Sequence, residues 1–394
     1  MSAETAQQFV ALEAQAQILM PVFMAAGHDL VAPAIIQPAN VFLDAVGEQL
    51  RARTYVFTDQ DGAELCLRPD LTVPVCRLHL ARQPVKPETP AKYCYNGPAF
   101  RYQPQNADGM HPREFRQAGI ECIGDNAREA AEAETVVLIV RALEKAGLKS
   151  WSIHLGDLGL LSAILAGAGV APRWQKRLAG SFGRPDVFHA ELKRLATAPG
   201  ASARALGFSF KSAALGGENL SSLQNELVTF LDSNHLEITG TRTVHEVAER
   251  LAEIAEDAAA KPLDAMTAKL IENYAAVSGP ARTASERIAL LLKGANANAQ
   301  PALRAFDRRL DLIADAGIDL DRVRFSAVFG RNLAYYTGLV FEVRAEGLGP
   351  GSPVAGGGRY DGLMKLAGAA TDIPAVGAAI HTERLLAVLM GAAL

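Results

Sequence analysis

Two pairs of short apolar segments lie close together in the first third of the chain, and a turn-forming loop joins each pair. Residues 55–58 and 64–67 flank a loop that ends in Gly62, and residues 92–102 and 113–124 flank a longer polar loop. Consecutive strands joined in this way pair as hairpins, whereas parallel strands need a long crossover between them. The sequence therefore predicts an antiparallel sheet rather than a doubly wound parallel one.

Between the strand-rich ends of the chain lies a long stretch rich in Ala and Leu. From about residue 158 to residue 315 its apolar residues recur at the intervals of amphipathic helices. We therefore expect an α+β fold, with helices flanking the antiparallel sheet. Residues 1–170 would form the first part of the core, 171–320 a mainly helical insertion, and 321–394 the second part of the core.

Local patterns predict the individual elements. The first helix covers residues 4–26, and Pro21 should kink or end it, because proline lacks an N–H and clashes with the preceding turn. We expect further helices over residues 71–82, 128–146, 244–258, 284–292 and 382–390, and further strands over residues 28–36, 151–155, 323–329 and 339–344.

The composition is that of a globular protein and argues against several classes of function. Of 394 residues, 49% are hydrophobic, and 39 basic against 43 acidic residues leave a net charge of -4. Because non-specific binding to nucleic acid or to membranes needs clustered Lys and Arg, we expect neither. No apolar run approaches the ~20 residues that cross a bilayer, and the N-terminus lacks the pattern of a signal peptide. We therefore expect a cytoplasmic protein.

The cysteine and glycine patterns argue against a zinc site and a phosphate-binding P-loop. No two cysteines have the two-residue spacing of a zinc ribbon, so we expect small buried side chains at Cys66, Cys76, Cys94 and Cys122. The glycine-rich motif over residues 355–362 lacks the Gly-Lys-Ser/Thr ending of a P-loop. Its glycines allow a close approach of backbones or a positive φ, and a plain tight turn has the same pattern.

The two longer predicted strands carry polar residues on one face. Because side chains alternate along a strand, Gln117 and Glu121 point the same way with Gly119 between them, and Arg101 lies on the partner strand. Such a floor suits an amino acid, whose carboxylate would bind the arginine and whose ammonium group would bind the glutamate. A solvated sheet face with a cross-strand ion pair has the same pattern.

Three further motifs have a structural interpretation, and the first two of them also have a functional one. Asp70 is placed to cap the helix that follows it, or to bind an ammonium group together with Thr72. The adjacent Tyr335 and Tyr336 point to opposite faces if the chain is extended, so one packs while the other lines a pocket, or both are half-buried. At residues 382–386, acidic and basic residues at a helix start are also typical of a solvated surface.

In their order and spacing, these motifs together resemble the catalytic domain of the histidyl-tRNA synthetase family. The resemblance covers residues 1 to about 165 and 320 to 394. Its most specific elements are Tyr-Tyr-Thr-Gly at 335–338 and Gly-Gly-Arg-Tyr-Asp-Gly at 357–362, and residues 33–48 resemble the first motif, which builds the dimer. The resemblance implies a class II aminoacyl-tRNA synthetase fold, in which helices flank an antiparallel sheet.

The resemblance also implies a retained pocket for histidine. Asp70 stands where the family has a glutamate, and Arg331 matches the arginine that helps activate the carboxylate of histidine. No metal or other cofactor is implied. The implied histidine-binding residues are Asp70, Thr72, Arg101, Gln117, Glu121, Arg331, Tyr335, Tyr336 and Tyr360.

The nucleotide-binding positions depart from the family. In the second motif Gln103 replaces a glutamate that helps hold adenine, His111 falls near a position where the family has an arginine, and Ala334 replaces an aspartate. Arg384 of the third motif, which would pair with ATP, is retained. Because adenylate formation depends on several positioned charges acting together, we expect no catalysis by this chain.

After the third motif the chain has about ten residues, where histidyl-tRNA synthetases carry an anticodon-binding domain. We therefore expect no such domain and no tRNA partner. This combination resembles the ATP phosphoribosyltransferase regulatory subunits, a short branch of synthetase paralogues.

Membership of that branch implies a non-catalytic subunit that acts in the first step of histidine biosynthesis. It would be required for the activity of a short-form catalytic subunit within a hetero-octamer, and for feedback inhibition by histidine. It would also dimerise through its synthetase-like core. The alternative is a truncated ligase that still activates an amino acid, which the retained Arg101, Arg331 and Arg384 keep open.

Overall fold

The chain divides into two compact units. The computed structural model describes residues 5–45, 48–103, 112–197, 220–236, 243–259, 261–294, 299–331, 333, 335–349 and 351–391. Residues 1–185 with 273–394 form the first unit, called the sheet unit below, and residues 186–272 form the second, called the helical unit.

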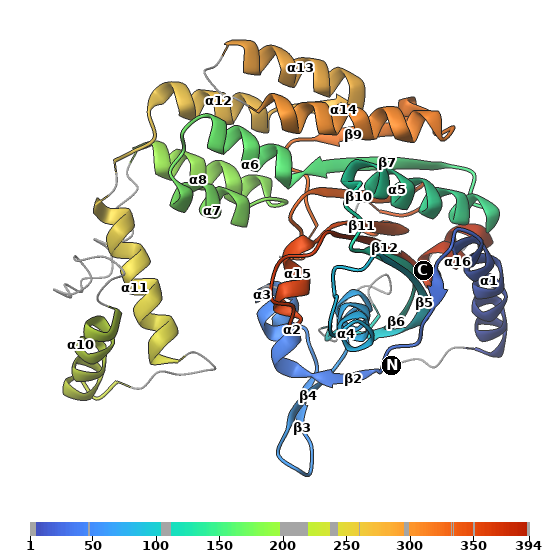
Figure 1. The fold of residues 1–394 in the computed structure, drawn as a ribbon, viewed down its shortest axis with the longest axis horizontal. Helices are drawn as coiled ribbons and strands as arrows, with labels where there is room; N and C mark the ends of the chain where they lie inside the picture. Colours follow the sequence, from blue (N-terminus) through green and yellow to red (C-terminus); the bar gives the residue numbers. More distant parts are fainter. Residues whose placement is uncertain are drawn as a thin grey trace. The chain divides into compact units, whose positions relative to one another are not determined.

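A nine-stranded sheet forms the centre of the sheet unit (Figure 1). The strand order is β1-β5-β6-β12-β11-β10-β7-β9-β8. β1 with β5 and β7 with β9 run parallel, and the other neighbours run antiparallel, which confirms the predicted sheet. The strands are β1 (Asp29–Leu30), β5 (Ala91–Phe100), β6 (Glu114–Ile123), β7 (Trp151–Asp157), β8 (Ser278–Pro280), β9 (Val323–Ser326), β10 (Leu339–Ala345), β11 (Ala355–Arg359) and β12 (Ala375–His381).

Both predicted hairpins are confirmed. β3 (Val56–Thr58) pairs antiparallel with β4 (Glu64–Leu67), and Gly62 in their loop has a φ of +84°, which glycine adopts without steric cost. β2 (Ile36–Pro38) pairs with the other edge of β4 to complete a small second sheet. The longer hairpin is β5 with β6, which pair along their whole lengths.

The two strands at the centre of the large sheet, β11 and β12, were not predicted. The glycines of β11 form a buried strand, so the tight-turn interpretation of this motif is wrong and the close-approach interpretation is confirmed. A Cβ atom at Gly357 would overlap the carbonyl oxygen of Gly377 on β12. Only glycine therefore lets these two strands lie together without displacement of the backbone.

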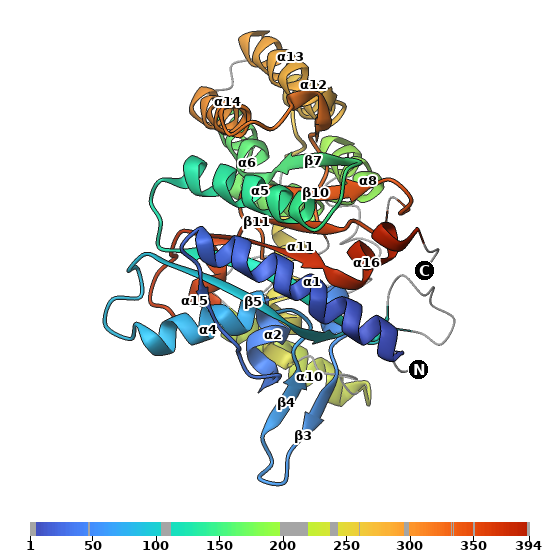
Figure 2. The same cartoon turned by 90° about the vertical axis from the view of Figure 1, so that its right-hand side faces the viewer.

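Three helices cover one face of the sheet: α1 (Ala6–Ala25), α5 (Arg128–Lys145) and α16 (Thr382–Met390). α1 packs on α5 and on α16, and Figure 2 shows α1 lying along α5. α1 continues through Pro21, so of the two predicted outcomes, a kink or an end of the helix, the end is excluded. Leu19 and Phe23, on either side of this proline, are fully buried, and their packing stabilises the helix across the missing hydrogen bond.

The opposite face of the sheet carries α2 (Ala39–Ala45), α4 (Thr72–Arg82) and α15 (Asp361–Leu366). Cys122 of β6 packs with Ala131 of α5, so the alternate residues of β6 point away from α5 and toward this second layer. The predicted polar face of β6 therefore lies opposite the three-helix layer.

Most of the remaining helices lie within residues 158–315, the stretch that was predicted to be helical. α14 packs against α5, and both ends of the segment predicted as an insertion (171–320) belong to the sheet unit, which leaves only residues 186–272 as a separate unit. In the helical unit, α10 and α11 share a small core of Leu223, Leu227, Ala248 and Ala252. The helices are α3 (Glu48–Arg51), α6 (Leu158–Gly167), α7 (Pro172–Gly180), α8 (Pro185–Thr197), α10 (Leu220–Ser233), α11 (Val244–Ala259), α12 (Ala265–Ala275), α13 (Ala281–Gly294), α14 (Gln300–Asp315) and the 3-10 turn η3 (Leu320–Arg322).

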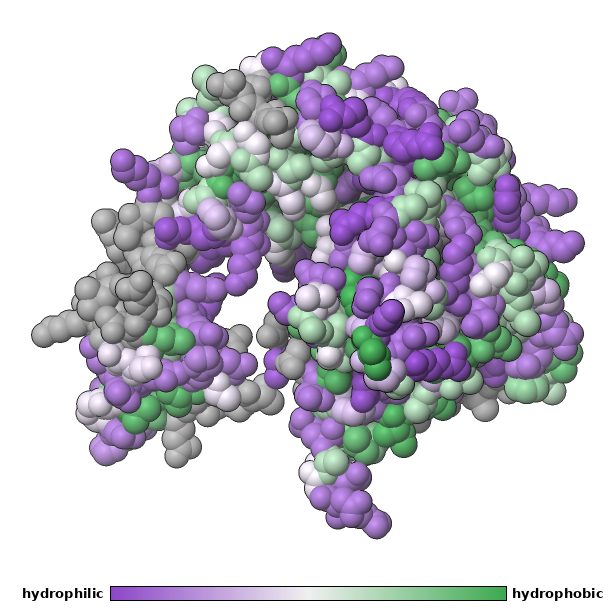
Figure 3. Space-filling view, in the orientation of Figure 1, coloured by the Kyte–Doolittle hydropathy of each residue, from purple (hydrophilic) through white to green (hydrophobic). Residues whose placement is uncertain are grey.

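The surface is that of a globular protein, and the cysteines are buried, as the composition and the sequence pattern predicted. The face drawn in Figure 3 is mainly polar, with apolar patches scattered between the polar side chains. All four cysteines are buried and free, as predicted. Within the described ranges, none of the helices has both the length and the apolar character needed to cross a bilayer.

Candidate functional site

A polar cavity of about 190 Å³ lies on the face of the sheet that carries α4 and α15. Its floor comes from β6, β11 and β12, and its walls come from the start of α4 and from the segment before β10. Eight of the nine predicted site residues line it, namely Asp70, Thr72, Arg101, Gln117, Arg331, Tyr335, Tyr336 and Tyr360. Residues that are far apart in the sequence therefore meet around one space of small-molecule size.

The ninth predicted residue, Glu121, lies beneath the floor of the cavity. Its side chain is fully buried and accepts hydrogen bonds from the hydroxyl groups of Tyr95, at 3.0 Å, and of Tyr360. A Cβ atom at Gly377 would overlap Oε2 of Glu121, so a glycine on β12 makes room for the carboxyl group. Glu121 thus contacts the lining of the cavity through Tyr360.

Burial raises the pKa of Glu121 to about 7, although hydrogen bonds from Tyr360, Thr72 and Tyr95 oppose the shift. The folded protein therefore keeps this carboxyl group protonated in a pH range where the unfolded chain ionises it. Below pH 4.5 both states hold the proton, and from pH 4.5 to about 7 only the unfolded state releases it. The free energy of unfolding should therefore fall by about 3 kcal/mol as the pH rises through this window.

Glu121→Gln removes this titration and is expected to gain stability relative to the unmodified protein as the pH rises from 4.5 to 7. Urea unfolding followed by circular dichroism at several pH values measures the difference between the two proteins. A difference that stays constant over this range would show that Glu121 ionises as an ordinary carboxyl group.

Asp70 and Arg101 lie at one wall, close enough for their charges to affect each other. Asp70 accepts a hydrogen bond from the backbone N–H of Val73 at 3.2 Å, so it contacts the first turn of α4, although the N-cap residue is Leu71 and not Asp70 as predicted. Burial raises the pKa of Asp70, and the positive charge of Arg101 opposes the shift. The Nε atom of Arg101 donates to the carbonyl oxygen of Pro69 at 2.8 Å, which holds its guanidinium group in place. The acidic neighbour of Arg101 is therefore Asp70 and not Glu121.

Arginines gather around the rest of the cavity. Arg331 lies 3.7 Å from the carboxylate of Glu342, and Arg384 donates to the carbonyl oxygen of Pro353 at 2.9 Å. Burial and then the neighbouring charges of Arg101 and Arg331 lower the pKa of Arg384 to about 10. Because these guanidinium groups repel one another, this side of the cavity favours an anionic group on a ligand.

Two buried polar atoms of the lining have no hydrogen-bond partner among the described residues: Oε1 of Gln117, an acceptor, and Nε of Arg331, a donor. A buried polar group without a partner costs on the order of 1–3 kcal/mol. A ligand that offers both a donor and an acceptor would satisfy both atoms. The cavity thus suits a small zwitterion, with its anionic end at the arginines and its cationic end at Asp70 and Gln117.

The predicted set left out several lining residues. Glu342 stands in the otherwise mainly apolar strand β10, where a charged residue is a signal for a polar environment, and Arg53 precedes the short hairpin. His381 ends β12, so it could not be placed before that strand was recognised, and its ring lies 5.5 Å from that of Phe115. Arg384 was predicted only as a nucleotide contact, and it lines the same cavity.

Some of the positions compared with the synthetase motifs lie outside the described residues. These are His111 and Ala334, whereas Gln103 is described and its carbonyl oxygen accepts a hydrogen bond from Arg113 at 3.0 Å. Within the described part of the chain, no cluster of three or more His, Cys, Asp or Glu side chains is arranged to hold a metal ion.

Comparison with known proteins decides the family. A profile of the histidyl-tRNA synthetase family matches residues 5–250 and 228–385. A protein of Agrobacterium fabrum named ATP phosphoribosyltransferase regulatory subunit is 37% identical over 374 residues, which cover 94% of this chain and 95% of the relative. A protein of the same name from Mesorhizobium japonicum is 35% identical over 93% of this chain and 95% of its own length. The chain belongs to the family of ATP phosphoribosyltransferase regulatory subunits. The predicted resemblance is thereby confirmed.

Solved structures agree on the fold. A Bacillus halodurans protein described as an ATP phosphoribosyltransferase regulatory subunit/histidyl-tRNA synthetase superposes with a TM-score of 0.68 at 20% identity, covering 99% of this chain and 82% of its own. The histidyl-tRNA synthetase of a Nostoc species superposes with a TM-score of 0.61 at 16% identity, covering 96% of this chain and 72% of its own. The class II synthetase-like fold is therefore confirmed for this regulatory subunit family member. The family name denotes a regulatory rather than a catalytic component, in agreement with the altered nucleotide motifs.

Proposed function

We propose that this chain is the regulatory subunit of an ATP phosphoribosyltransferase in histidine biosynthesis. In this role it is required for the activity of a short-form catalytic subunit and takes part in feedback inhibition by histidine. The observation that carries the proposal is the polar cavity, lined by eight of the nine predicted histidine-binding residues, in a chain of this family. The complex acts in the cytoplasm as a hetero-octamer, in which this chain dimerises through its synthetase-like core.

Histidine binds in the cavity with its carboxylate toward Arg101 and Arg331 and its ammonium group toward Asp70 and Gln117. Forked guanidinium contacts suit the carboxylate, and Oε1 of Gln117 supplies an acceptor that has no partner among the described residues. The imidazole ring then points to the floor, where Tyr360 and Glu121 lie. Tyr360 lines the cavity there, and its hydroxyl group donates to the buried Glu121.

Reconstitution tests this function directly. The transfer of a phosphoribosyl group to ATP is measured under three conditions. The purified short-form catalytic subunit is assayed by itself, together with this chain, and together with this chain and increasing concentrations of histidine. We expect activity only when both chains are present, and a progressive loss of that activity as histidine is added. Equal activity without this chain, or activity that histidine does not change, would contradict the proposal.

The same protein preparation addresses the alternative ligase. Arg101, Arg331 and Arg384 are all retained around the cavity, which is the observation that favours amino-acid activation. Histidine-dependent exchange of pyrophosphate into ATP measures adenylate formation. We expect none above the rate without histidine, and robust exchange would identify a ligase instead of a regulatory subunit.

A further inference from the structure

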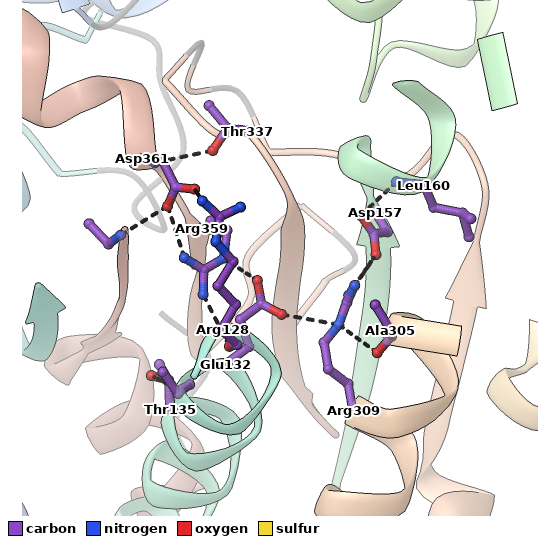
Figure 4. A network of polar contacts seen from close by, with 12 residues as sticks. Arg128, Glu132, Thr135, Asp157, Leu160, Ala305, Arg309, Thr337, Arg359 and Asp361 are labelled. Carbon is purple, nitrogen blue, oxygen red and sulfur yellow. Dashed lines mark hydrogen bonds and ion pairs between the residues drawn. The ribbon is translucent and has the colours of Figure 1, made fainter. Parts of the chain in front are cut away.

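A chain of alternating charges crosses the core of the sheet unit (Figure 4). Arg309 on α14 binds Asp157 at the end of β7 through two hydrogen bonds of 2.7 and 2.8 Å. Nε of the same arginine lies 3.0 Å from Oε2 of Glu132 on α5, whose Oε1 accepts from Nε of Arg359 on β11. Arg359 in turn donates to Asp361 at 2.8 Å. We call these five residues the ion chain.

Four of the five residues of the ion chain are deeply buried, and each of them lies against a side chain of opposite charge. Asp157, Glu132, Arg309 and Arg359 expose between 1% and 7% of their surfaces. Burial alone would lower the pKa of Arg309, yet Asp157 and Glu132 hold it above its ordinary value. Charges taken out of water persist only when each faces a partner, so the position of each member depends on its neighbours.

The two ends of the ion chain hold one short piece of backbone, Thr337-Gly338. At one end, the N–H of Thr337 donates to the carbonyl oxygen of Arg359 at 2.8 Å, and its hydroxyl group accepts from the N–H of Asp361 at 3.1 Å. At the other end, the carbonyl oxygen of Gly338 accepts from the N–H of Leu158, which follows Asp157, at 3.1 Å. Asp157 also caps α6 by accepting from the N–H of Leu160 at 3.0 Å.

This piece of backbone carries part of the cavity wall. Tyr335 and Tyr336 precede Thr337 directly, and both line the cavity. Tyr360, which lies between the ion-chain residues Arg359 and Asp361, donates to Glu121 beneath the floor. Three tyrosines of the site are therefore attached to residues that the ion chain fixes, whereas Arg309 itself does not line the cavity.

We propose that Arg309 of α14 is a positioning residue for the cavity, and that it acts through Glu132, Arg359 and Asp157 on the Thr337-Gly338 backbone. Removal of the Arg309 side chain takes a positive charge away from two buried carboxylates, those of Glu132 and Asp157. Glu132 and Asp157 must then turn toward solvent or take up protons, and either change releases their hold on Arg359 and on the start of α6. The identity of the ligand rests on the proposed function, whereas the effect on the backbone does not.

The test compares three single variants at position 309 and beside it. Arg309→Met keeps much of the volume and removes the charge, Arg309→Lys keeps the charge without the forked geometry, and Leu310→Ala damages the same helix at a buried apolar position. Hydrogen–deuterium exchange of the ligand-free full chain reports on the amides of Leu158, Thr337 and Asp361. Calorimetry measures the Kd for histidine, and thermal unfolding measures Tm for each variant.

We expect Arg309→Met to speed exchange at these three amides and to weaken histidine binding by about 2- to 30-fold, the range found for coupled remote sites. Arg309→Lys, which keeps the positive charge, should show a smaller increase in exchange and a smaller loss of affinity than Arg309→Met. Leu310→Ala should lower Tm by at least as much as Arg309→Met does. Its effects on exchange at the three amides and on the Kd for histidine should be smaller than those of Arg309→Met. Only a positioning role gives this separation between loss of stability and loss of affinity.

Unchanged exchange at the three amides in Arg309→Met would overturn the inference, as would equal local effects in Leu310→Ala. If the unmodified chain binds no histidine, the proposed function fails, while the exchange comparison still decides whether Arg309 holds the backbone. The two failures are therefore distinguishable in one set of experiments.

Discussion

Glu132→Ala is expected to lower the free energy of unfolding by about 3–5 kcal/mol, because removal of one partner leaves buried charges uncompensated. Glu132 is the only member of the ion chain, among its five residues, that contacts both Arg309 and Arg359. Without it, two guanidinium groups face each other in the core. Urea unfolding at pH 7, followed by circular dichroism, gives the free energy change.

Glu134→Ala on the same helix is the matched control. Glu134 pairs with Lys92 at 2.6 Å, but its side chain is 44% exposed. A surface pair of this kind contributes about 0–1 kcal/mol, so we expect a small loss. Similar losses in the two variants would mean that burial of the ion chain adds no stability beyond that of an exposed pair.

Gly356→Ala is expected to weaken histidine binding by about 10- to 100-fold, the equivalent of one lost hydrogen bond to a charged group. A Cβ atom at this position would overlap Nη1 of Arg331 and would lie 2.9 Å from the carbonyl oxygen of Phe341. The end of a long side chain moves more easily than the backbone does. The guanidinium group should therefore leave its place in the cavity while the sheet persists.

Gly362→Ala in the same glycine-rich motif serves as the control for that measurement. Its nearest contact would be Cγ2 of Thr337 at 3.9 Å, an ordinary van der Waals distance, and the residue lies in α15, where alanine is favoured over glycine. Calorimetry with histidine should give an unchanged Kd for this variant. An unchanged Kd in Gly356→Ala as well would show that Arg331 does not contact the ligand.

Segment length and turn signals were enough to predict several elements of the fold. The strands β5 and β6 are long segments on either side of a polar loop, and α5 is a long run of helix-forming residues that stops before Gly147. β11 and β12 are short and rich in Gly and Ala, and neither feature is typical of a strand. Two central strands of the sheet were therefore invisible to pattern analysis, although the glycines correctly indicated a close approach of backbones.

The site shows a similar limit. Alternation along β6 placed Gln117 and Glu121 on one face, but it could not show that Glu121 lies below the floor, because that depth depends on Gly377 of an unpredicted strand. The ion chain joins residues as far apart as Arg359 and Glu132, which are 227 positions apart in the sequence. Such pairings follow from the packed fold, and no local pattern contains them.

The glycines of β11 and β12 also limit how this cavity can change in evolution. No residue is smaller than glycine, so no substitution at Gly356 or Gly377 can enlarge the cavity, and a Cβ atom at these positions would overlap Arg331 or Glu121. The main chain thus sets a ceiling on the size of the bound molecule along this floor. Descendants of this gene that came to accept a bulkier metabolite would have to trim the aromatic wall instead, at Tyr335, Tyr336 or Tyr360.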